Sequence, residues 1–261
     1  EDPVRMLRAV RLAAKLGFDI APETAAPIPG LAPLLGEAAP ARLFEEMLKL
    51  FLAGHAVASF EGLERYGLLG VLLPETAAAL RSNRSGALRR MLVEGLRNTD
   101  ARVAADEPVS PAFLFALLLW PAYCRALAAL QAQGMQAEEA QRRAADRVTL
   151  HQVQTIALPK RFSLPMQEIW LLQTRFGSRQ RKRVFRLLAH PRFRAAYDFL
   201  VLRLAASDGH AADVEFWRHA QQTSGDELAA TLDAAAAAGD PEALPARRRR
   251  RRRRRSATAA E

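Results

Sequence analysis

Apolar residues recur through this chain with the period of an α-helix. On the opening stretch, at about 100° per residue, one side of a helix carries Met6, Leu7, Val10, Ala13 and Ala14. Asp2 and Pro3 form a typical helix start, because Asp accepts hydrogen bonds from the free N–H groups of a first turn. Gly17 follows as a stop. The pattern therefore predicts an amphipathic helix that ends just before this glycine.

The helical period continues to about residue 206, after a proline-rich connector over 20–40. Further helices are predicted over 41–54, 60–75 (as one or two), 84–105, 111–130, 138–157, 164–176, 179–189 and 191–206. No run alternates apolar and polar residues as a strand does, and no Asn-Gly hairpin turn occurs. Abundant Ala, Leu and Arg also favour helix. We therefore predict an all-α fold.

The most apolar predicted helix could belong to a protein core or to a membrane. It lies in a stretch of 17 uncharged residues, from Pro108 to Cys124, that includes three prolines. A spanning helix needs about 20 mostly apolar residues. We interpret the stretch as a buried core helix and predict no membrane partner.

Positive charge is concentrated in two segments. The formal net charge of the chain is +10. Residues 156–206 hold eleven Lys or Arg against Glu168 and Asp198, and Arg247–Arg255 adds nine more, so the remaining residues are net negative. This asymmetry indicates a polyanionic partner, with nucleic acid first and an acidic membrane surface second.

The cysteine and histidine usage excludes several kinds of site. The single cysteine, Cys124, rules out an internal disulfide and a four-cysteine zinc site, and it fits a reduced, cytoplasmic setting. The five histidines are scattered, and none pairs with a second ligand at metal spacing. We therefore predict no metal site among these residues.

The opening stretch, EDPVRMLRAVRLAAKLGF, also places four cations on one side of its helix: Arg5, Arg8, Arg11 and Lys15. It resembles the neck-helix motif of the bacterial poly(A) polymerase and CCA-adding tRNA nucleotidyltransferase superfamily, a Glu-Asp-x-x-Arg followed by Leu-Arg-Ala and a Gly-Phe close. The resemblance implies that Asp2 and Arg5 present hydrogen-bonding groups to the base of the incoming nucleotide, with Glu1 and Arg8 in support. Without the resemblance, Asp2 is an ordinary helix cap and the cations form a solvated helix face.

Later segments resemble bacterial poly(A) polymerases, in that family's order, from Ala41 to Arg203. They are ARLFEEMLKLFLAGHA, NTDARV, VSPAFLFALLLWP, IALPKRF, EIWLLQTRF and LLAHPRFRAAYDFLVLR. The basic C-terminal run belongs to the same branch. The resemblance covers residues 1–206 and favours a poly(A) polymerase over a CCA-adding enzyme.

The chain departs from the family where the chemistry is expected. The family transfers adenylate from ATP to an RNA 3′ hydroxyl, and its magnesium ligands lie on a Gly-Ser loop and an Asp-x-Asp strand upstream of the neck helix. No Asp-x-Asp occurs in these 261 residues. We therefore expect a catalytic head that binds magnesium before Glu1, and we expect this chain to bind ATP and RNA without polymerising.

The predicted RNA surface consists of cations, because guanidinium groups can bind phosphate with two parallel hydrogen bonds. Its residues are Arg11, Lys15, Lys160, Arg161, Arg179, Arg181, Lys182, Arg183, Arg186, Arg192, Arg194, Arg247, Arg250 and Arg255. A charge run is ordinarily a solvated face, but the excess over 156–206 goes beyond that. Aromatic residues interleave with these cations and could stack on bases, although Trp170, Phe185 and Tyr197 are expected in the core.

We divide the chain into four parts. They are a neck and RNA-binding helical domain over 1–75, a basic helical body over 76–206, an Ala-rich, weakly ordered linker over 207–246 and a disordered arginine tail over 247–261.

The expected partners are RNA 3′ ends, ATP and proteins of RNA decay. Two alternatives stay open: a fragment of a CCA-adding enzyme, and a non-catalytic helical RNA-binding or scaffold protein that begins close to Glu1.

Overall fold

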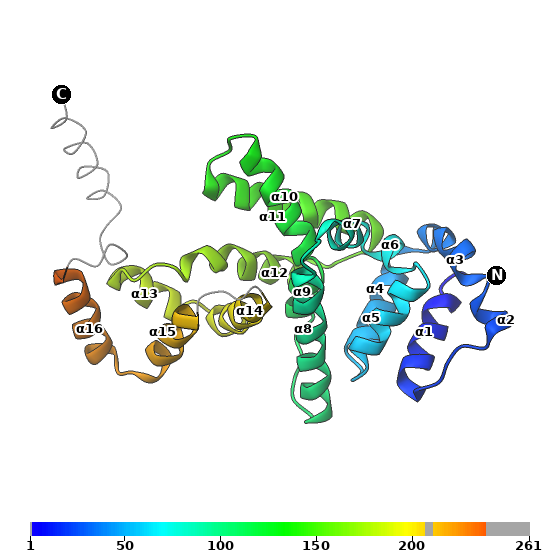
Figure 1. Cartoon of the computed structure of the whole chain (residues 1–261), viewed down its shortest axis with the longest axis horizontal. Helices are drawn as coiled ribbons and strands as arrows, with labels where there is room; N and C mark the ends of the chain where they lie inside the picture. Colours follow the sequence, from blue (N-terminus) through cyan, green and yellow to red (C-terminus); the bar gives the residue numbers. More distant parts are fainter. Residues whose placement is uncertain (1, 207–210, 239–261) are drawn as a thin grey trace. The chain divides into compact units, whose positions relative to one another are not determined.

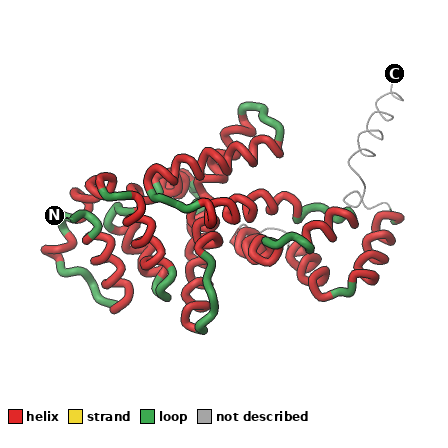
Figure 2. Tube along the Cα trace, turned by 180° about the vertical axis from the view of Figure 1, so that it is seen from behind, coloured by secondary structure: helices red, strands yellow, loops and turns green. Residues whose placement is uncertain are grey.

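The computed structural model describes residues 2–206 and 211–238, and over these ranges it contains helices and loops but no strand (Figures 1 and 2). The prediction of an all-α fold is confirmed. The chain falls into two compact units, one within Glu1–Trp170 and Ala205–Asp208 and the other within Leu171–Leu204 and Gly209–Glu261. The predicted boundary between residues 75 and 76 stays a prediction.

The first unit holds most of the helices. They are α1 (Arg5–Leu16), α2 (Pro22–Ala25), α3 (Ile28–Leu31), the 3₁₀ helix η1 (Ala32–Glu37), α4 (Pro40–Phe51), α5 (Ala56–Arg65), α6 (Leu69–Leu72), α7 (Pro74–Ser82), α8 (Ala87–Ala104), α9 (Pro111–Leu118), α10 (Trp120–Ala132), α11 (Ala137–Thr155) and most of α12 (Lys160–Leu172). The predicted connector over 20–40 contains three short helices. Each has a proline in its first turn, where a missing N–H costs little.

Helix α1 is amphipathic as predicted, and it packs beside α4 and α5 (Figure 1). Leu7 and Val10 are buried on its inner side, and it ends at Gly17, whose φ of 67° favours glycine. Gly62 of α5 allows the close approach, because a Cβ at that position would lie 2.7 Å from Cγ1 of Val10. The position of the cationic stripe is therefore set by tight packing on its opposite side.

Helix α5 is capped from a distant part of the chain. The carboxylate of Asp100, on α8, accepts hydrogen bonds from the backbone N–H groups of Ala56 (2.6 Å) and Val57 (3.2 Å). These N–H groups belong to the first turn of a helix and have no partner within it. Asp100 lies in the segment NTDARV, so one role of that segment is to hold the first turn of α5 against α8.

The apolar stretch that begins at Pro111 is buried, as predicted, but it forms two helices. The helices α9 and α10 meet at Leu119 and are bent by 52°. Within the described residues no single helix is long and apolar enough to cross a membrane, while this bent pair meets the requirement by length and composition together. Trp170 closes the core beneath α9 by donating a hydrogen bond from Nε1 to the carbonyl of Ala116, at 2.9 Å.

The second unit contains η2 (Gln173–Arg175), α13 (Arg181–Leu188), most of α14 (Phe193–Ala206), α15 (Ala211–Gln222) and α16 (Gly225–Ala237). Its core surrounds Trp217, which is 0% exposed and donates a hydrogen bond to the carbonyl of Phe176 at 2.7 Å. Leu228 and Leu232 of α16 pack into the same core.

The second unit differs from the sequence-based expectation for residues 207–246. We expected a weakly ordered linker, but α15 and α16 occupy 211–222 and 225–237. Trp217 and Ala220 of α15 and Leu228 and Leu232 of α16 are buried in the core, and the alanine-rich composition around the last two concealed this pattern. The arginine tail over 247–261 lies outside the described residues.

Candidate nucleic-acid interface

Asp2 is held at the start of α1 by two hydrogen bonds. Its Oδ1 accepts from the backbone N–H of Val4 at 3.1 Å, and its Oδ2 accepts from Nη2 of Arg42 on α4 at 2.7 Å. The hydrogen bond from Arg42 is the largest cause that lowers the pKa of Asp2, and the Val4 hydrogen bond also lowers it. Asp2 therefore fixes the turn just before α1, whose N-cap is Val4, and is also a charged acceptor with a fixed orientation.

The cationic stripe of α1 converges on a buried carboxylate of α4. Glu46 is only 4% exposed, and Nζ of Lys49 donates a hydrogen bond to its Oε1 at 2.9 Å. Nε of Arg8 lies 3.9 Å from the same Oε1, and Nε of Arg11 lies 3.6 Å from Oε2. One negative charge thus holds three positive charges together, which leaves a positive excess at the surface between the two helices.

The four predicted cations of α1 differ in exposure. Arg5, Arg8 and Lys15 are exposed, whereas the side chain of Arg11 is only 27% exposed and faces Glu46. Nε of Arg11 and Oε2 of Glu46 are buried and form no hydrogen bond. Arg11 is therefore engaged by α4 to a greater extent than the sequence indicated.

Sequence reasoning missed the polar side of α4. Arg42, Glu46 and Lys49 follow one another at steps of four and three, so they lie on one face of the helix. The segment was interpreted only through its apolar positions. A carboxylate flanked by two cations at helical spacing was the available signal, although its pairing with α1 required the fold.

Lys160 and Arg161 begin α12 next to another part of α4. The backbone N–H of Ala157 donates to the carbonyl of Pro40, the first residue of α4, at 3.1 Å. The ring of Phe162 stacks on that of Phe44 with centroids 6.0 Å apart, and the guanidinium of Arg161 lies 4.9 Å from the Phe162 centroid. Both predicted cations are exposed. Helix α4 therefore lies next to two sets of predicted RNA contacts, one on α1 and one at the start of α12.

The second unit presents a separate cationic surface on α13. Arg181, Lys182, Arg183 and Arg186 are exposed, while Val184 and Leu187 of the same helix are buried in the core. Arg181 pairs with Asp233 at 2.7 Å. Lys182, Arg183 and Arg186 make no ion pair with the residues that the structure describes. These three side chains form the most available positive surface of this unit.

The other predicted cations of this unit are placed differently. Arg179 is only 13% exposed: it pairs with Asp213, donates to the carbonyl of Phe176 at 2.7 Å and lies 4.0 Å from the ring centroid of Phe216. The guanidinium of Arg179 is therefore engaged within its own unit, unlike the exposed cations of α13. Arg192 and Arg194 are exposed, and Arg194 pairs with Asp198 at 3.1 Å.

Most interleaved aromatic rings of the basic segment are core residues. Trp170 and Tyr197 are buried as expected, and Phe176 and Phe193 are buried too, whereas Phe185 is half-buried. Buried rings cannot stack on bases.

Among residues 2–206 and 211–238, no group of three His, Cys, Asp or Glu side chains could hold a metal ion. Glu1, Arg247, Arg250 and Arg255 lie outside the described residues.

Two family models match this chain. One is described as "Polymerase A arginine-rich C-terminus" and matches residues 133–256, which include α13 and the arginine run. The other is described as "Probable RNA and SrmB- binding site of polymerase A" and matches residues 17–80, which include α4 and its polar side. The basic surface on α13 thus lies within the first match, and α4 lies within the second, whereas the cations of α1 lie outside both.

Several proteins of assigned function are similar to the chain. Poly(A) polymerase I of Escherichia coli O6:H1 is 46% identical over 204 residues, which are 78% of this chain and 44% of that protein. Poly(A) polymerase I of Haemophilus influenzae is 36% identical over 228 residues, 87% of this chain and 50% of that protein. The CC-adding tRNA nucleotidyltransferase of Thermus thermophilus is 42% identical over 91 residues, 33% of this chain and 21% of that protein. The chain spans about half the length of the poly(A) polymerases that it matches.

Proposed function

Because this chain belongs to the poly(A) polymerase family, we propose that it is the RNA- and nucleotide-binding part of an enzyme that adds AMP from ATP to RNA 3′ ends. The observation that carries the proposal is the convergence of α1 and α4 around Asp2 and Glu46. It joins a fixed hydrogen-bond acceptor to an excess of cations on one surface. A base edge and a phosphate need these two features side by side.

The proposed roles follow from the chemistry of each group. Asp2 offers acceptor oxygens to the adenine of ATP and Arg5 offers donors, with Glu1 and Arg8 in support. Arg42 fixes the direction of the Asp2 carboxylate. Glu46 holds the guanidinium groups of Arg8 and Arg11 in place, so that less side-chain entropy is lost when a phosphate binds.

Further RNA contacts are proposed in each unit separately. In the first unit, Arg11, Lys15, Lys160 and Arg161 are proposed to bind phosphates along α1 and at the start of α12. In the second unit, the proposed contacts are the exposed side chains of Arg181, Lys182, Arg183, Arg186, Arg192 and Arg194. The arginine run, including Arg247, Arg250 and Arg255, adds attraction that does not depend on RNA sequence.

The magnesium that family chemistry requires does not fit the described residues. They contain no cluster of three ligand side chains, and the carboxylates of Asp2 and Glu46 are already engaged by cations. We therefore derive no metal-dependent step from them and expect this chain by itself to incorporate no AMP.

RNA 3′ ends and ATP are the proposed partners, with proteins of RNA decay as further ones. A cytoplasmic location belongs to the same proposal and is supported by the single cysteine.

Fluorescence anisotropy with a single-stranded oligoadenylate tests the proposal. Arg8→Gln removes one cation from the α1–α4 surface, whereas Arg97→Gln removes an exposed cation of α8 that pairs with Glu94. We expect Arg8→Gln to weaken RNA binding by about tenfold, the effect of one charged hydrogen bond. We expect Arg97→Gln to leave the affinity nearly unchanged. Equal affinities of the two variants would contradict the proposed interface.

A CCA-adding activity is the second candidate, and the similarity to a CC-adding tRNA nucleotidyltransferase over 33% of the chain is the observation in its favour. The longer match, over 78% of the chain, is to a poly(A) polymerase. The two activities separate when a full-length parent enzyme receives either ATP with a generic RNA, or CTP with a tRNA that lacks its 3′ end. Incorporation of CMP into the tRNA would favour the second candidate.

A further inference from the structure

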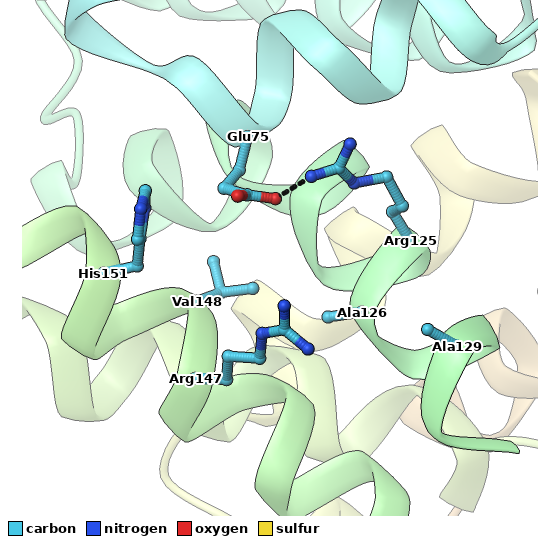
Figure 3. A pocket seen from close by; sticks show the side chains of 7 residues that line it. All are labelled: Glu75, Arg125, Ala126, Ala129, Arg147, Val148 and His151. Carbon is cyan, nitrogen blue, oxygen red and sulfur yellow. Dashed lines mark hydrogen bonds and ion pairs between the residues drawn. The ribbon is translucent and has the colours of Figure 1, made fainter. Parts of the chain in front are cut away.

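A pocket of about 300 Å³ lies between α7, α10 and α11, within the first unit and apart from the α1–α4 surface (Figure 3). Its lining residues are Glu75 from α7, Arg125, Ala126 and Ala129 from α10, and Arg147, Val148 and His151 from α11. Neither the motifs nor the two basic surfaces described above include these residues.

The pocket is a consequence of small residues between packed helices. Helices α10 and α11 form a hairpin and α7 packs across α10, so the three helices meet at its base (Figure 1). Ala126 and Ala129 leave room where longer side chains would fill the space. Arg147 and His151 are four residues apart, so they lie on the same face of α11, and Val148 is buried beside them.

The charges of the pocket favour an anion. Glu75 pairs with Arg125, as the dashed line in Figure 3 marks, so these two charges offset each other. Arg147 makes no ion pair with the residues that the structure describes. Two nearby carboxylates of α11 are engaged elsewhere: Glu139 pairs with Arg143 at 2.7 Å, and Asp146 accepts a hydrogen bond from Gln167 of α12 at 3.4 Å. An unpaired guanidinium and an imidazole therefore face the same small cavity.

We propose that this pocket binds the phosphate group of a nucleotide, either a free nucleotide or one residue of a bound RNA. Arg147 donates two parallel hydrogen bonds to the phosphate oxygens, and His151 donates a third from its ring N–H. Arg125 lies at the edge of the site, where its pair with Glu75 offsets its charge. The short wall of Ala126, Ala129 and Val148 leaves space for the sugar or base.

The dimensions favour a nucleotide over an acidic protein segment. A volume of about 300 Å³ is at the lower end of the range for small-molecule pockets, so it fits one nucleotide but not an extended peptide. An acidic segment would need cations spread along a surface, whereas these converge on one cavity. The binding of an RNA residue in this pocket rests on the proposed function, whereas the binding of a free nucleotide does not.

Calorimetric titration of the 261-residue chain with AMP and with inorganic phosphate tests the site. Arg147→Gln is expected to weaken binding of both probes by about tenfold. The matched control is Arg143→Gln, which removes the same charge from the same helix one turn away and outside the pocket. Its affinities are expected to stay within about twofold of the parent chain, because only a screened long-range charge is lost.

Glu75→Gln gives a test that a misfolded variant cannot mimic. It removes the only carboxylate of the pocket, so AMP is expected to bind about two- to fivefold more tightly. Unchanged or weaker binding in this variant would overturn the proposal.

Anisotropy titrations with a single-stranded oligoadenylate distinguish the two sources of the phosphate. If Arg147→Gln weakens RNA binding and Arg143→Gln does not, the pocket takes a residue of the RNA; if only AMP and phosphate binding fall, it takes a free nucleotide. Equal effects of the two variants on all probes would overturn the site. Loss of polyglutamate binding without loss of AMP binding would identify an acidic protein segment and also overturn it. A parent chain that binds AMP but no RNA would contradict the proposed function alone.

Discussion

Glu46→Gln tests whether the α1–α4 surface depends on the positions of its cations or only on their charge. The substitution keeps the size of the side chain and removes one negative charge. A surface that attracts RNA by net charge alone should then bind RNA more tightly. A surface whose arginines are held in place by Glu46 should bind RNA more weakly, because Arg8 and Arg11 lose their common anchor. The two explanations therefore predict that the substitution changes RNA affinity in opposite directions.

The effect on stability can be estimated from the distances. Three cationic nitrogens lie 2.9, 3.6 and 3.9 Å from the Glu46 oxygens. At an effective dielectric constant of about 20, each such pair interacts by roughly 4–6 kcal/mol. Most of this attraction offsets the desolvation of the carboxylate, and breaking a buried pair costs about 3–5 kcal/mol. Arg8 and Lys49 are about half exposed and regain water, so we lower the expected loss to about 2 kcal/mol.

Thermal unfolding and RNA anisotropy measure the two consequences. A loss of about 2 kcal/mol in a unit of this size lowers Tm by roughly 4–8 °C. RNA affinity is expected to fall by about fivefold to tenfold. Glu45→Gln is the matched control, since Glu45 is an exposed neighbour on the same helix and its replacement changes the net charge equally. It should leave Tm unchanged and should tighten RNA binding slightly.

Tighter RNA binding by Glu46→Gln than by Glu45→Gln would refute this reasoning. Glu46 would then be a carboxylate that only reduces the positive field. An unchanged Tm would separately show that the three ion pairs contribute no net stability.

Gly62→Ala is expected to lower the unfolding free energy of the first unit by about 1–3 kcal/mol, because its Cβ would lie 2.7 Å from Val10; an unchanged Tm would contradict the close packing. Deletion of Arg247–Arg255 is expected to flatten the slope of log RNA affinity against log salt by about 3.5, if about five charges engage single-stranded phosphates; an unaltered slope would exclude the tail from binding. Since Arg42 lowers the pKa of Asp2, the stability from their pair is present above the ordinary pKa of 3.8 and is lost as pH falls through the lowered pKa. Asp2→Asn should therefore make the acid decline of stability shallower in urea titrations, and an identical decline would contradict the pairing.

The helical elements could be predicted well because their signals are local. In α1 these signals are the period of Leu7 and Val10, the hydrogen bond from Val4 to Asp2 just before the helix, and the stop at Gly17. The uncharged stretch after Pro108 was correctly interpreted as core, although the bend at Leu119 was not foreseen. Residue type and spacing are sufficient for such features, because they depend on neighbours no more than four positions away.

The members of the site could be predicted only in part. The cations of α1 were visible as a stripe, but their anchor, Glu46, lies 35 residues after Arg11 along the chain. Arg179 was expected on the RNA surface, and its partner Asp213 lies 34 residues away. In both cases a long-range ion pair decides how far the guanidinium remains available, and no local spacing reports that pairing.

The sequence by itself determined the all-α character, the amphipathic opening helix, the two basic segments and the family. These follow from periodicity, composition and motif order, which are properties of the chain before it folds. Only the tertiary structure decided that Glu46 and Arg42 of α4 organise the charged face of α1, that α15 and α16 complete a core around Trp217, and that Arg147 and His151 face a pocket beside α7. The physical reason is that charge pairing and cavity shape depend on which helix faces meet, and helix packing brings together residues that are far apart in the sequence.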